Sequence, residues 1–359
     1  MEMRKKFDEI FEDCTKLGTK IKTDEYHSNG KHPIIDQGQE MVAGFTDLED
    51  GLFDAVPAIV FGDHTRIIKY VDYPFFLGAD GVKVLRSKVP NANYRYLYYA
   101  LKNAKIPNTG YNRHYKWLKE LEIEYPPISQ QIKTVKVLDE VESIIHNRQN
   151  QLQKLDELVK ARFVEMFGDC KSMVSMNELC SIITDGTHQP PRFQESGIPF
   201  IFVSNLVGNV VTYNAEKFIS EDTYAELYKR TPIEIGDLLL STVGSYGHPA
   251  VVTEDRKFLF QRHIAYLKPR HNMVNSFYLH SALLAPDGQR QIEEKVKGIA
   301  QKTLNLSEIK KIAVPLPTIE EQNQFEKFVN QTDKSKVAVQ KSLDEAQLLF
   351  DSLMQQYFG

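Results

Sequence analysis

The sequence predicts a mixed α/β (α+β) protein made of two similar halves, each a globular block followed by one long helix. The first observation is an internal repeat. Residues 121–131 align with residues 312–322, and Phe167-Gly168 aligns with Phe358-Gly359, at one offset (317 − 126 = 191 and 358 − 167 = 191). The second observation is that the block before each repeat mixes short apolar runs, typical of buried strands, with amphipathic segments typical of helices. Strands and helices interspersed in this way indicate an α/β or α+β unit, present twice.

Length and composition limit the possible classes of protein. A chain of 359 residues corresponds to about two domains, and 42% hydrophobic with 26% charged residues is typical of globular proteins. The three cysteines, Cys14, Cys170 and Cys180, are odd in number and unclustered, which argues against a disulfide framework and favours a reducing, cytoplasmic location. No cysteine pair has zinc-ligand spacing, so no metal site is expected. We predict neither a secretory signal nor a membrane span, which needs about 18 apolar residues.

The repeated element has the pattern of a long helix. Proline at 126–127 in the first copy, and at 315 and 317 in the second, favours an extended approach followed by a helix start. We expect Ser129 and Thr318 to cap these helices. A helix of about 39 residues, about 58 Å long, follows in each half. Apolar residues recur on it at spacings of three and four, at Leu138, Val141, Ile145, Leu152, Leu155, Val159 and Met166 in the first copy and at Val329, Val339, Leu343, Ala346, Phe350, Leu353 and Tyr357 in the second.

This seam predicts that the two helices pair with each other as an antiparallel coiled coil. The alternative is a generic coiled coil through which the chain dimerises. In the blocks before the helices, strands are expected at 58–61, 82–85, 199–203, 237–241 and 264–267, and helices at 93–102 and 277–284. The chain is therefore divided into a first block (1–117), a first helical region (118–168), a second block (169–306) and a second helical region (307–359).

Charge is distributed unevenly along the chain. The formal net charge is −4, but residues 86–119 hold eight Lys or Arg and no acid, and residues 257–302 hold eight Lys or Arg against three acids. A nucleic-acid-binding protein needs a basic surface rather than a basic total. Two basic stretches at matching places in two halves favour nucleic-acid binding over an ordinary solvated face.

The motifs of the two blocks resemble those of a known family. The segments 34–39, 59–66, 78–83 and 110–116 are similar to one type of target recognition domain, and the segments 184–191, 197–200, 236–241 and 262–265 to another. Both types occur in the specificity (S) subunits of type I restriction-modification systems. The repeated Pro-x-Gln-Gln and Pro-x-x-Glu-Gln segments, with their helices, resemble the conserved spacer regions of that family. The resemblance covers essentially the whole chain, and the order of the motifs is more specific than any single one.

The resemblance implies a function in prokaryotic defence. Each recognition domain reads one half of a split, asymmetric DNA site, and the paired helices set the gap between the halves. Two methyltransferase (M) subunits dock on the helices, and motor-nuclease (R) subunits complete the restriction complex. S-adenosylmethionine, ATP and magnesium belong to those partners, so the chain itself is expected to hold no cofactor.

A search for catalytic motifs favours a non-catalytic chain. Tyr125-Pro-Pro-Ile resembles the Asp/Asn-Pro-Pro-Tyr motif of adenine methyltransferases only superficially, because no amide or acid directly precedes Pro126. The chain has no Gly-x-x-x-x-Gly-Lys-Ser/Thr phosphate loop. His64, in the turn Gly62-Asp63-His64-Thr65, is more typical of a hydrogen-bonding residue than of a catalyst. A fused methyltransferase-nuclease is therefore rejected, whereas a coiled-coil scaffold without DNA binding remains the alternative function.

Candidate DNA contacts are chosen by side-chain chemistry. Arg suits guanine O6 and N7, Asn and Gln suit adenine N6 and N7, and Lys, Tyr, Ser and Thr mostly contact phosphates. Each candidate has an alternative interpretation as an ordinary loop residue. The candidates are His64, Thr65, Arg66, Lys69, Arg113, His114, Tyr115 and Lys116 in the first block, and Thr187, His188, Gln189, Arg192, Ser245, Tyr246, His248, Arg262, Gln301 and Lys302 in the second.

Overall fold

The structure is a computed structural model that describes residues 4–78, 80–110, 112–298 and 301–359. It divides into two compact units. The first unit comprises residues 1–148 and 341–359, and the second comprises residues 149–340. The predicted segment boundaries follow the change from block to helix, whereas the compact units divide the chain within the helices.

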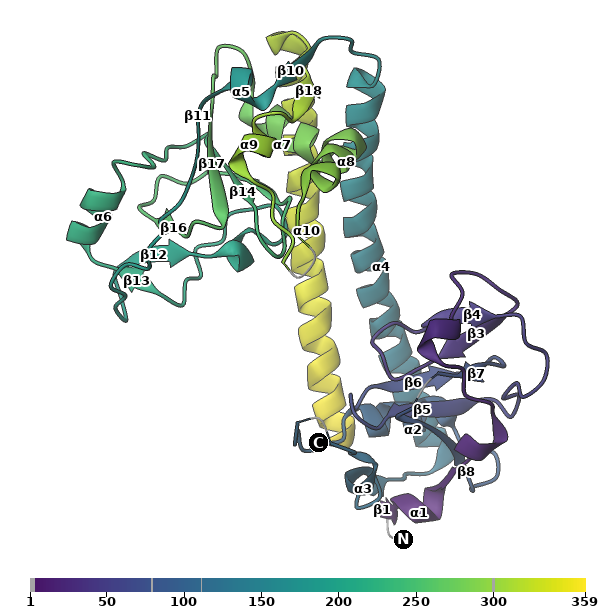
Figure 1. The fold of residues 1–359 in the computed structure, drawn as a ribbon. Helices are drawn as coiled ribbons and strands as arrows, with labels where there is room; N and C mark the ends of the chain where they lie inside the picture. The colour runs from purple at the N-terminus through teal and green to yellow at the C-terminus, as the bar shows by residue number, and fades with distance from the viewer. Residues whose placement is uncertain (1–3, 79, 111, 299–300) are drawn as a thin grey trace. The chain divides into compact units, whose positions relative to one another are not determined.

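Two helices of 40 residues each follow the globular blocks, as the sequence predicts (Figure 1). They are α4 (Ile128–Phe167) and α10 (Ile319–Phe358). Thr318 caps α10, because its hydroxyl accepts the Glu321 backbone N–H at 3.3 Å while the Glu321 carboxylate accepts the Thr318 N–H at 2.9 Å. The expectation for Ser129 is wrong, since α4 already begins at Ile128 and Ser129 lies inside the first turn.

The helices pair antiparallel within each unit. In the first unit Leu138 and Val141 of α4 share a core with Phe350 and Met354 of α10, while Arg148 donates to the Ser342 hydroxyl at 3.1 Å. In the second unit the rings of Phe163 and Phe325 lie 5.5 Å apart, and Lys336 pairs with Asp156 at 2.8 Å. Higher numbers on one helix thus face lower numbers on the other. All the residues of the predicted seam are buried or half-buried.

The blocks of the two units share one strand topology. Each has a four-stranded antiparallel sheet, in the order β2-β8-β5-β6 in the first unit and β11-β17-β14-β15 in the second. Each also has a three-stranded sheet with one antiparallel and one parallel pair, β4-β3-β7 and β13-β12-β16. A short strand at the start of each block pairs with the strand that precedes the long helix, β1 with β9 and β10 with β18.

The strands of the first unit are β1 (Arg4–Lys6), β2 (Phe11–Asp13), β3 (His32–Ile35), β4 (Gly44–Thr46), β5 (Ala58–Gly62), β6 (Ile68–Val71), β7 (Phe76–Leu77), β8 (Val82–Ser87) and β9 (Glu122–Glu124). Those of the second unit are β10 (Met173–Ser175), β11 (Cys180–Asp185), β12 (Ile198–Ile201), β13 (Phe218–Ile219), β14 (Leu238–Ser241), β15 (Pro249–Val251), β16 (Leu259–Phe260), β17 (Ile264–Pro269) and β18 (Ala313–Pro315). The five predicted strands are thereby found within two residues of their expected bounds.

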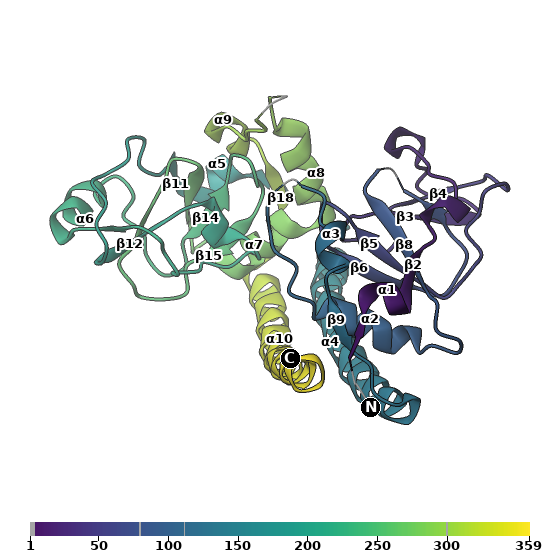
Figure 2. The same ribbon diagram turned by 90° about the horizontal axis from the view of Figure 1, so that it is seen from below.

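Short helices also correspond between the units. The first unit has α1 (Phe7–Ile10), α2 (Tyr94–Lys102) and α3 (Tyr115–Leu118), and the second has α5 (Met176–Leu179), α6 (Glu221–Leu227), α7 (Ser276–Leu284), α8 (Pro286–Lys295) and α9 (Leu306–Ile309). Single 3-10 turns occur at Thr15–Leu17, Thr23–Glu25 and Val203–Leu206. Helix α2 packs against β5 and β6 (Figure 2). The helices predicted at 93–102 and 277–284 are α2 and α7, each capped by an asparagine side chain, Asn93 and Asn275.

Two glutamines show that the sequence repeat is also a structural repeat. The buried amides of Gln131 and Gln322 donate to the carbonyl oxygens of Pro126 and Pro317, at 2.8 Å and 3.0 Å. Each bond spans five residues and closes the turn that leads into the long helix. The aligned Pro and Gln positions of the sequence are thus the two ends of one hydrogen bond, made in both units.

The apolar runs form the cores of the sheets. Every residue of β5 and of β14 is buried, as expected for continuous apolar strands covered on both faces. The three cysteines are free. No helix in the described part of the chain is long and apolar enough to span a membrane.

Candidate functional site

The strand order places several loops at one edge of each four-stranded sheet. In the second unit β11 and β14 both run antiparallel to β17, so the ends of β11 and β14 and the start of β17 share that edge. The equivalent edge of the first unit holds the ends of β2 and β5 and the start of β8. The loops that leave these edges carry most of the predicted contact residues.

In the first unit, Asp63 ties three loops together. Its carboxylate accepts the Tyr115 backbone N–H at 2.7 Å, its carbonyl accepts the His114 N–H at 2.8 Å, and its own N–H donates to the Gly81 carbonyl at 2.7 Å. The His114 ring Nδ1 also lies 2.9 Å from the Asp63 carbonyl oxygen. The turn 62–67, Gly81 and the start of α3 at His114 and Tyr115 are therefore held as one surface.

Gln37 completes this loop cluster. Its side chain accepts the His64 backbone N–H at 3.2 Å and donates to the Asp80 carbonyl at 3.1 Å, and its own carbonyl accepts the Thr65 hydroxyl at 2.6 Å. Gly81, at φ +93°, faces the same amide, and a Cβ there would lie 2.7 Å from it. Sequence reasoning did not single out Gln37. Two signals point to it: its place in the family-like segment 34–39 and its position beside a strand end.

The candidates of the first unit differ in accessibility. Thr65, Arg113 and Lys116 are exposed, and His64, Arg66 and Tyr115 are half-buried. Arg66 adopts a left-handed backbone (φ 63°) and donates to the Ile106 carbonyl at 3.1 Å, so it supports the segment 103–114. Within the described residues, the Arg113 side chain makes no hydrogen bond or ion pair, which leaves its five donors available.

Lys69 and His114 are both buried, so direct contact with a ligand is not expected of them. The Lys69 side chain is 4% exposed, donates to the Glu40 carbonyl at 2.5 Å and lies 3.5 Å from Asp36. Burial lowers the pKa of Lys69, against the opposing influence of Asp36. Lys69 therefore supports the loop 36–40 from the protein interior. His114 fixes the start of α3 through its contact with Asp63.

In the second unit, three loops adjoin through their backbones. The Thr187 N–H donates to Phe260 at 3.0 Å, and the Arg262 N–H donates to Thr187 at 3.1 Å. The Thr242 N–H donates to His263 at 2.9 Å, which brings the loop after β14 to the same place. Residues 186–192, 242–248 and 261–263 thereby form one surface.

A second set of candidates meets beside the loop 242–248. The Gly244 N–H donates to the Lys302 carbonyl at 3.2 Å, and Val243 pairs with Thr303. Lys302 donates to the Tyr246 hydroxyl at 3.2 Å and pairs with Glu293 at 3.1 Å. Ser245, Tyr246, Gln301 and Lys302 are therefore brought together, with Tyr246 and Lys302 engaged by one glutamate. His248 turns instead toward Asn209, with Nδ1 3.2 Å from the amide oxygen.

The remaining candidates line a groove of about 440 Å³ between the loop after β11 and helix α6. Thr187, His188, Gln189 and Arg192 lie on one side of it. Arg230, just beyond the end of α6, lies on the other, and sequence reasoning missed it. Arg230 is 45 residues from its partner Asp185 along the chain, so only the fold reveals the pair.

Comparison with known proteins identifies the family. The profile of the family described as "Type I restriction modification DNA specificity domain" matches residues 3–156 and 172–346, one match in each half. The chain belongs to this family. The resemblance stated from the sequence is thereby confirmed, as is the predicted repeated α/β fold with long helices.

Individual specificity subunits resemble this family member over part of their length. The EcoBI type I specificity subunit of Escherichia coli is 31% identical over 170 residues, 47% of this chain and 36% of that protein. The EcoR124I/EcoR124II specificity subunit of the same organism is 30% identical over 84 residues, 23% and 21% of the two chains. The putative MjaX specificity subunit of Methanocaldococcus jannaschii is 22% identical over 189 residues, 51% and 44%. The matched region thus spans less than half of each curated relative.

Solved structures share the fold of the whole chain. The S subunit of a type I restriction-modification system from M. genitalium has a TM-score of 0.57 at 16% identity, covering 99% of this chain and 96% of that one. A chain from a structure of type I system assembly and conformational transition has a TM-score of 0.53 at 17% identity, covering 99% and 97%.

Part of each basic stretch of this family member is paired with acids of the protein. Arg95 and Lys102 pair with Asp139 and Glu142 of α4 rather than facing outward. In the second stretch, Lys257, Lys268, Arg290 and Lys302 each pair with a nearby acid. The local count of charges therefore overstates the free positive surface, because some of these cations pair with acids outside their stretch, as Arg95 does with Asp139, and others with acids inside it, as Arg290 does with Glu294. Across the described residues, no cluster of His, Cys, Asp and Glu has the arrangement of a metal site.

Proposed function

We propose that the chain reads DNA as the specificity subunit of a type I restriction-modification complex, with each unit reading one half of a bipartite, asymmetric site. The observation that carries this proposal is the shared loop edge. The same edge of the same four-stranded sheet bears the loop cluster in both units, but the residues on it differ. One architecture with two loop compositions suits two different half-sites. Family membership supports the same function.

The exposed side chains have the chemistry for this task. Arg113 in the first unit and Gln189 and Arg192 in the second are exposed. Arginine donates two hydrogen bonds to guanine, and glutamine pairs with the N6 and N7 positions of adenine in the major groove. Lys116 and Thr65 are suited to phosphates, which fix the register of the protein on the duplex.

The long helices are proposed to set the gap between the half-sites and to dock two methyltransferase subunits, with motor-nuclease subunits joining to form the nuclease. A 40-residue helix is about 60 Å long, and α4 and α10 each contribute residues to both units. The proposed role of the chain is recognition without catalysis in the cytoplasm. S-adenosylmethionine, ATP and magnesium would act in the partner subunits.

The test is to co-express the chain with its neighbouring methyltransferase and map methylated adenines in host DNA. We expect methylation at one split motif with a constant gap. Methylation that is independent of the chain, or that shows no split motif, would reject the specificity function and favour a scaffold role.

Single substitutions separate the two readers. We expect Arg113→Ala to relax the preference for one half-site by about tenfold, since a good bidentate base contact is worth about 1–3 kcal/mol. Arg192→Ala serves as the matched variant in the second unit and should affect the other half-site only. The readout is the base preference at each position of the methylated motif. Equal losses in both half-sites from either variant would contradict the two-reader arrangement.

A further inference from the structure

Asp185 contacts two side chains that line the groove of the second unit, Arg230 and His188. This aspartate is the last residue of β11, and its side chain is only 17% exposed. One carboxylate oxygen accepts from the Arg230 guanidinium at 2.5 Å, and the other lies 2.9 Å from the His188 ring Nε2. Both oxygens are thus engaged, and each fixes a side chain from a different loop.

Asp185 positions Arg230 but occupies only part of its guanidinium group. Its side chain is 51% exposed, and a single Nη2 contact to Asp185 is its hydrogen bond within the described residues. The remaining N–H groups of the guanidinium therefore have no protein acceptor there. Because the guanidinium is planar and rigid, the contact at one corner restricts the positions that its other donors can reach.

The residues around Arg230 form a structured groove on the candidate DNA-binding surface. Pro190 and Pro191 stiffen one wall of the groove, and Thr223 and Leu227 of α6 belong to the other. Thr187, in the same groove, is tied by its backbone to Phe260 and Arg262 at the loop edge. The groove therefore adjoins the edge to which the proposed function assigns DNA reading.

We propose that Arg230, oriented by Asp185, is a further base-reading residue of the second unit and that its target is a guanine in the corresponding half-site. Guanine presents two acceptors, O6 and N7, side by side in the major groove, and a planar pair of N–H donors matches them. This assignment rests on the proposed function. Asp185 acts as a positioning residue, since it fixes the arginine without facing the base.

Among the described residues of the first unit, the aspartate at the equivalent strand end does not orient an arginine. Its corresponding strand, β2, also ends in an aspartate, but Asp13 pairs with Lys83 at 2.8 Å and accepts from the Thr15 backbone N–H at 3.0 Å. Burial alone would raise the pKa of Asp13, but its hydrogen bonds with Lys83 and Thr15 outweigh burial and lower it. A lysine is a point charge without the fork of donors that recognises guanine. The proposed reader therefore belongs to one half-site only.

The test compares three variants in the full chain, co-expressed with its methyltransferase, on a library of sites randomised at each position of the split motif. We expect Arg230→Ala to reduce the preference for guanine at one position by about tenfold. Arg230→Lys, which keeps a charged donor but loses the planar fork, and Asp185→Asn should each reduce it less. The lysine variant keeps the charge and the surface location, so it separates base reading from folding. The other half-site should be unchanged in all three.

Arg256→Ala is the matched control. Arg256 is also 51% exposed and pairs with an acid, Glu254, at 3.7 Å, but it follows β15 at the opposite edge of the sheet. We expect it to leave the motif unchanged. An Arg230 variant that keeps the full guanine preference, or that lowers methylation equally at every target, overturns the assignment and leaves the proposed function standing. An unmodified chain that yields no split motif overturns the proposed function, and this assignment with it.

Discussion

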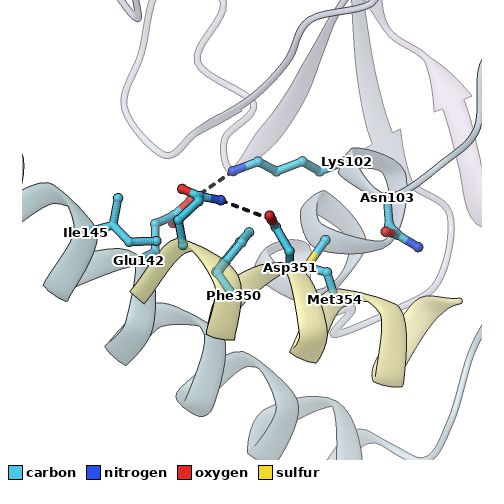
Figure 3. A pocket seen from close by; sticks show the side chains of 8 residues that line it. Lys102, Asn103, Glu142, Ile145, Phe350, Asp351 and Met354 are labelled. Carbon is cyan, nitrogen blue, oxygen red and sulfur yellow. Dashed lines mark hydrogen bonds and ion pairs between the residues drawn. The ribbon is translucent and has the colours of Figure 1, made fainter. Parts of the chain in front are cut away.

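The two units attach the same fold to their helix pair with different chemistry. In the first unit the attachment is an ionic junction, in which Arg95 and Lys102 of α2 meet Asp139 and Glu142 of α4, with the buried Tyr99 hydroxyl between them. Figure 3 shows the Lys102–Glu142 pair of this junction. In the second unit it is an aromatic junction, in which Phe163 and Phe167 of α4 surround Tyr278 of α7 and Phe325 of α10, with ring centroids 5.1–6.4 Å apart.

The difference teaches that topology, rather than one set of contacts, is what the two units share. In both, a tyrosine hydroxyl of the helix on the sheet donates to the strand before the long helix, Tyr96 to Glu124 at 3.0 Å and Tyr278 to Pro315 at 2.6 Å. The rest of each junction has diverged. The ionic junction borders a surface hollow of about 460 Å³ lined by Ile145, Phe350 and Met354.

The largest expected effect is on the aromatic junction. Phe163 is almost fully buried, so Phe163→Ala should destabilise the second unit by about 3–5 kcal/mol through lost contacts and a cavity. Hydrogen exchange followed by mass spectrometry should show faster exchange in α7. The single tryptophan, Trp117, lies in the first unit, and its fluorescence in urea should report little change there. Equal destabilisation of both units would show that the junctions do not act separately.

A smaller effect is expected at the ionic junction. Burial alone would lower the pKa of Arg95, but its bonds to Asp139 and the nearby Tyr99 raise it, so this arginine stays charged. Arg95→Met removes the arginine that pairs with the carboxylates of Asp139 and Glu142. We expect a loss of about 1–3 kcal/mol in the first unit, less than for a fully buried pair because these groups are partly exposed. Urea unfolding followed by Trp117 fluorescence measures it.

Arg4→Met provides the control for that substitution. Arg4 also pairs with a glutamate of the first unit, Glu124 at 2.7 Å, but it is 62% exposed. Solvent screens an exposed pair of this kind, so it contributes little to stability. If Arg95→Met cost no more than Arg4→Met, the ionic junction would be an ordinary surface pair and the comparison between the units would lose its basis.

The smallest expected effect is a difference in pH dependence. Burial lowers the pKa of His280 on α7, outweighing its bond to the Asn209 carbonyl and the charge of Asp333. The unfolded chain therefore binds a proton near pH 6.5 that the folded second unit does not, so the stability of this unit falls as pH drops below about 6.5. In the first unit, burial would raise the pKa of Glu142, but Lys102 and Arg95 lower it. The contribution of Glu142 to stability is therefore lost only as pH falls below the ordinary pKa of glutamate.

His280→Gln should remove this dependence from the second unit between pH 7.5 and 5.5 while leaving the first unit unaffected. The measurement is hydrogen exchange of α7 peptides, corrected for the intrinsic pH dependence of exchange. A wild-type chain whose second unit is equally protected at both pH values would contradict the prediction.

Much of the fold is readable from the sequence, for physical reasons. The long helices follow from an uninterrupted seam without Pro or Gly, and β5 and β14 from continuous apolar runs. The pairings of β1 with β9 and of β10 with β18 were not foreseen. They join segments far apart in sequence, and three-residue strands carry no periodicity to detect. Helix α8 was also missed, because Gly288 and few apolar residues obscure its pattern.

The candidate site is predictable at the level of loops but not of side chains. Polar loops after apolar strands end at the same sheet edge, so the chosen segments lie together in each unit. Sequence reasoning cannot tell that Lys69 and His114 point inward, since burial depends on which loop covers them. It also cannot find Gln37 or Arg230, whose roles arise from partners 27 and 45 residues away.

The return of α10 to the first unit has a consequence for the order of events during synthesis. Leu138 and Val141 of α4 need Phe350 and Met354 for their burial, and Asn103 donates to the Phe358 carbonyl across 255 residues. At roughly 5–20 residues per second, a ribosome needs about 10–40 s to make the intervening chain. The first unit is therefore synthesised first but completed last. During that interval the apolar face of α4 that later packs against α10 remains exposed to other molecules in the cell.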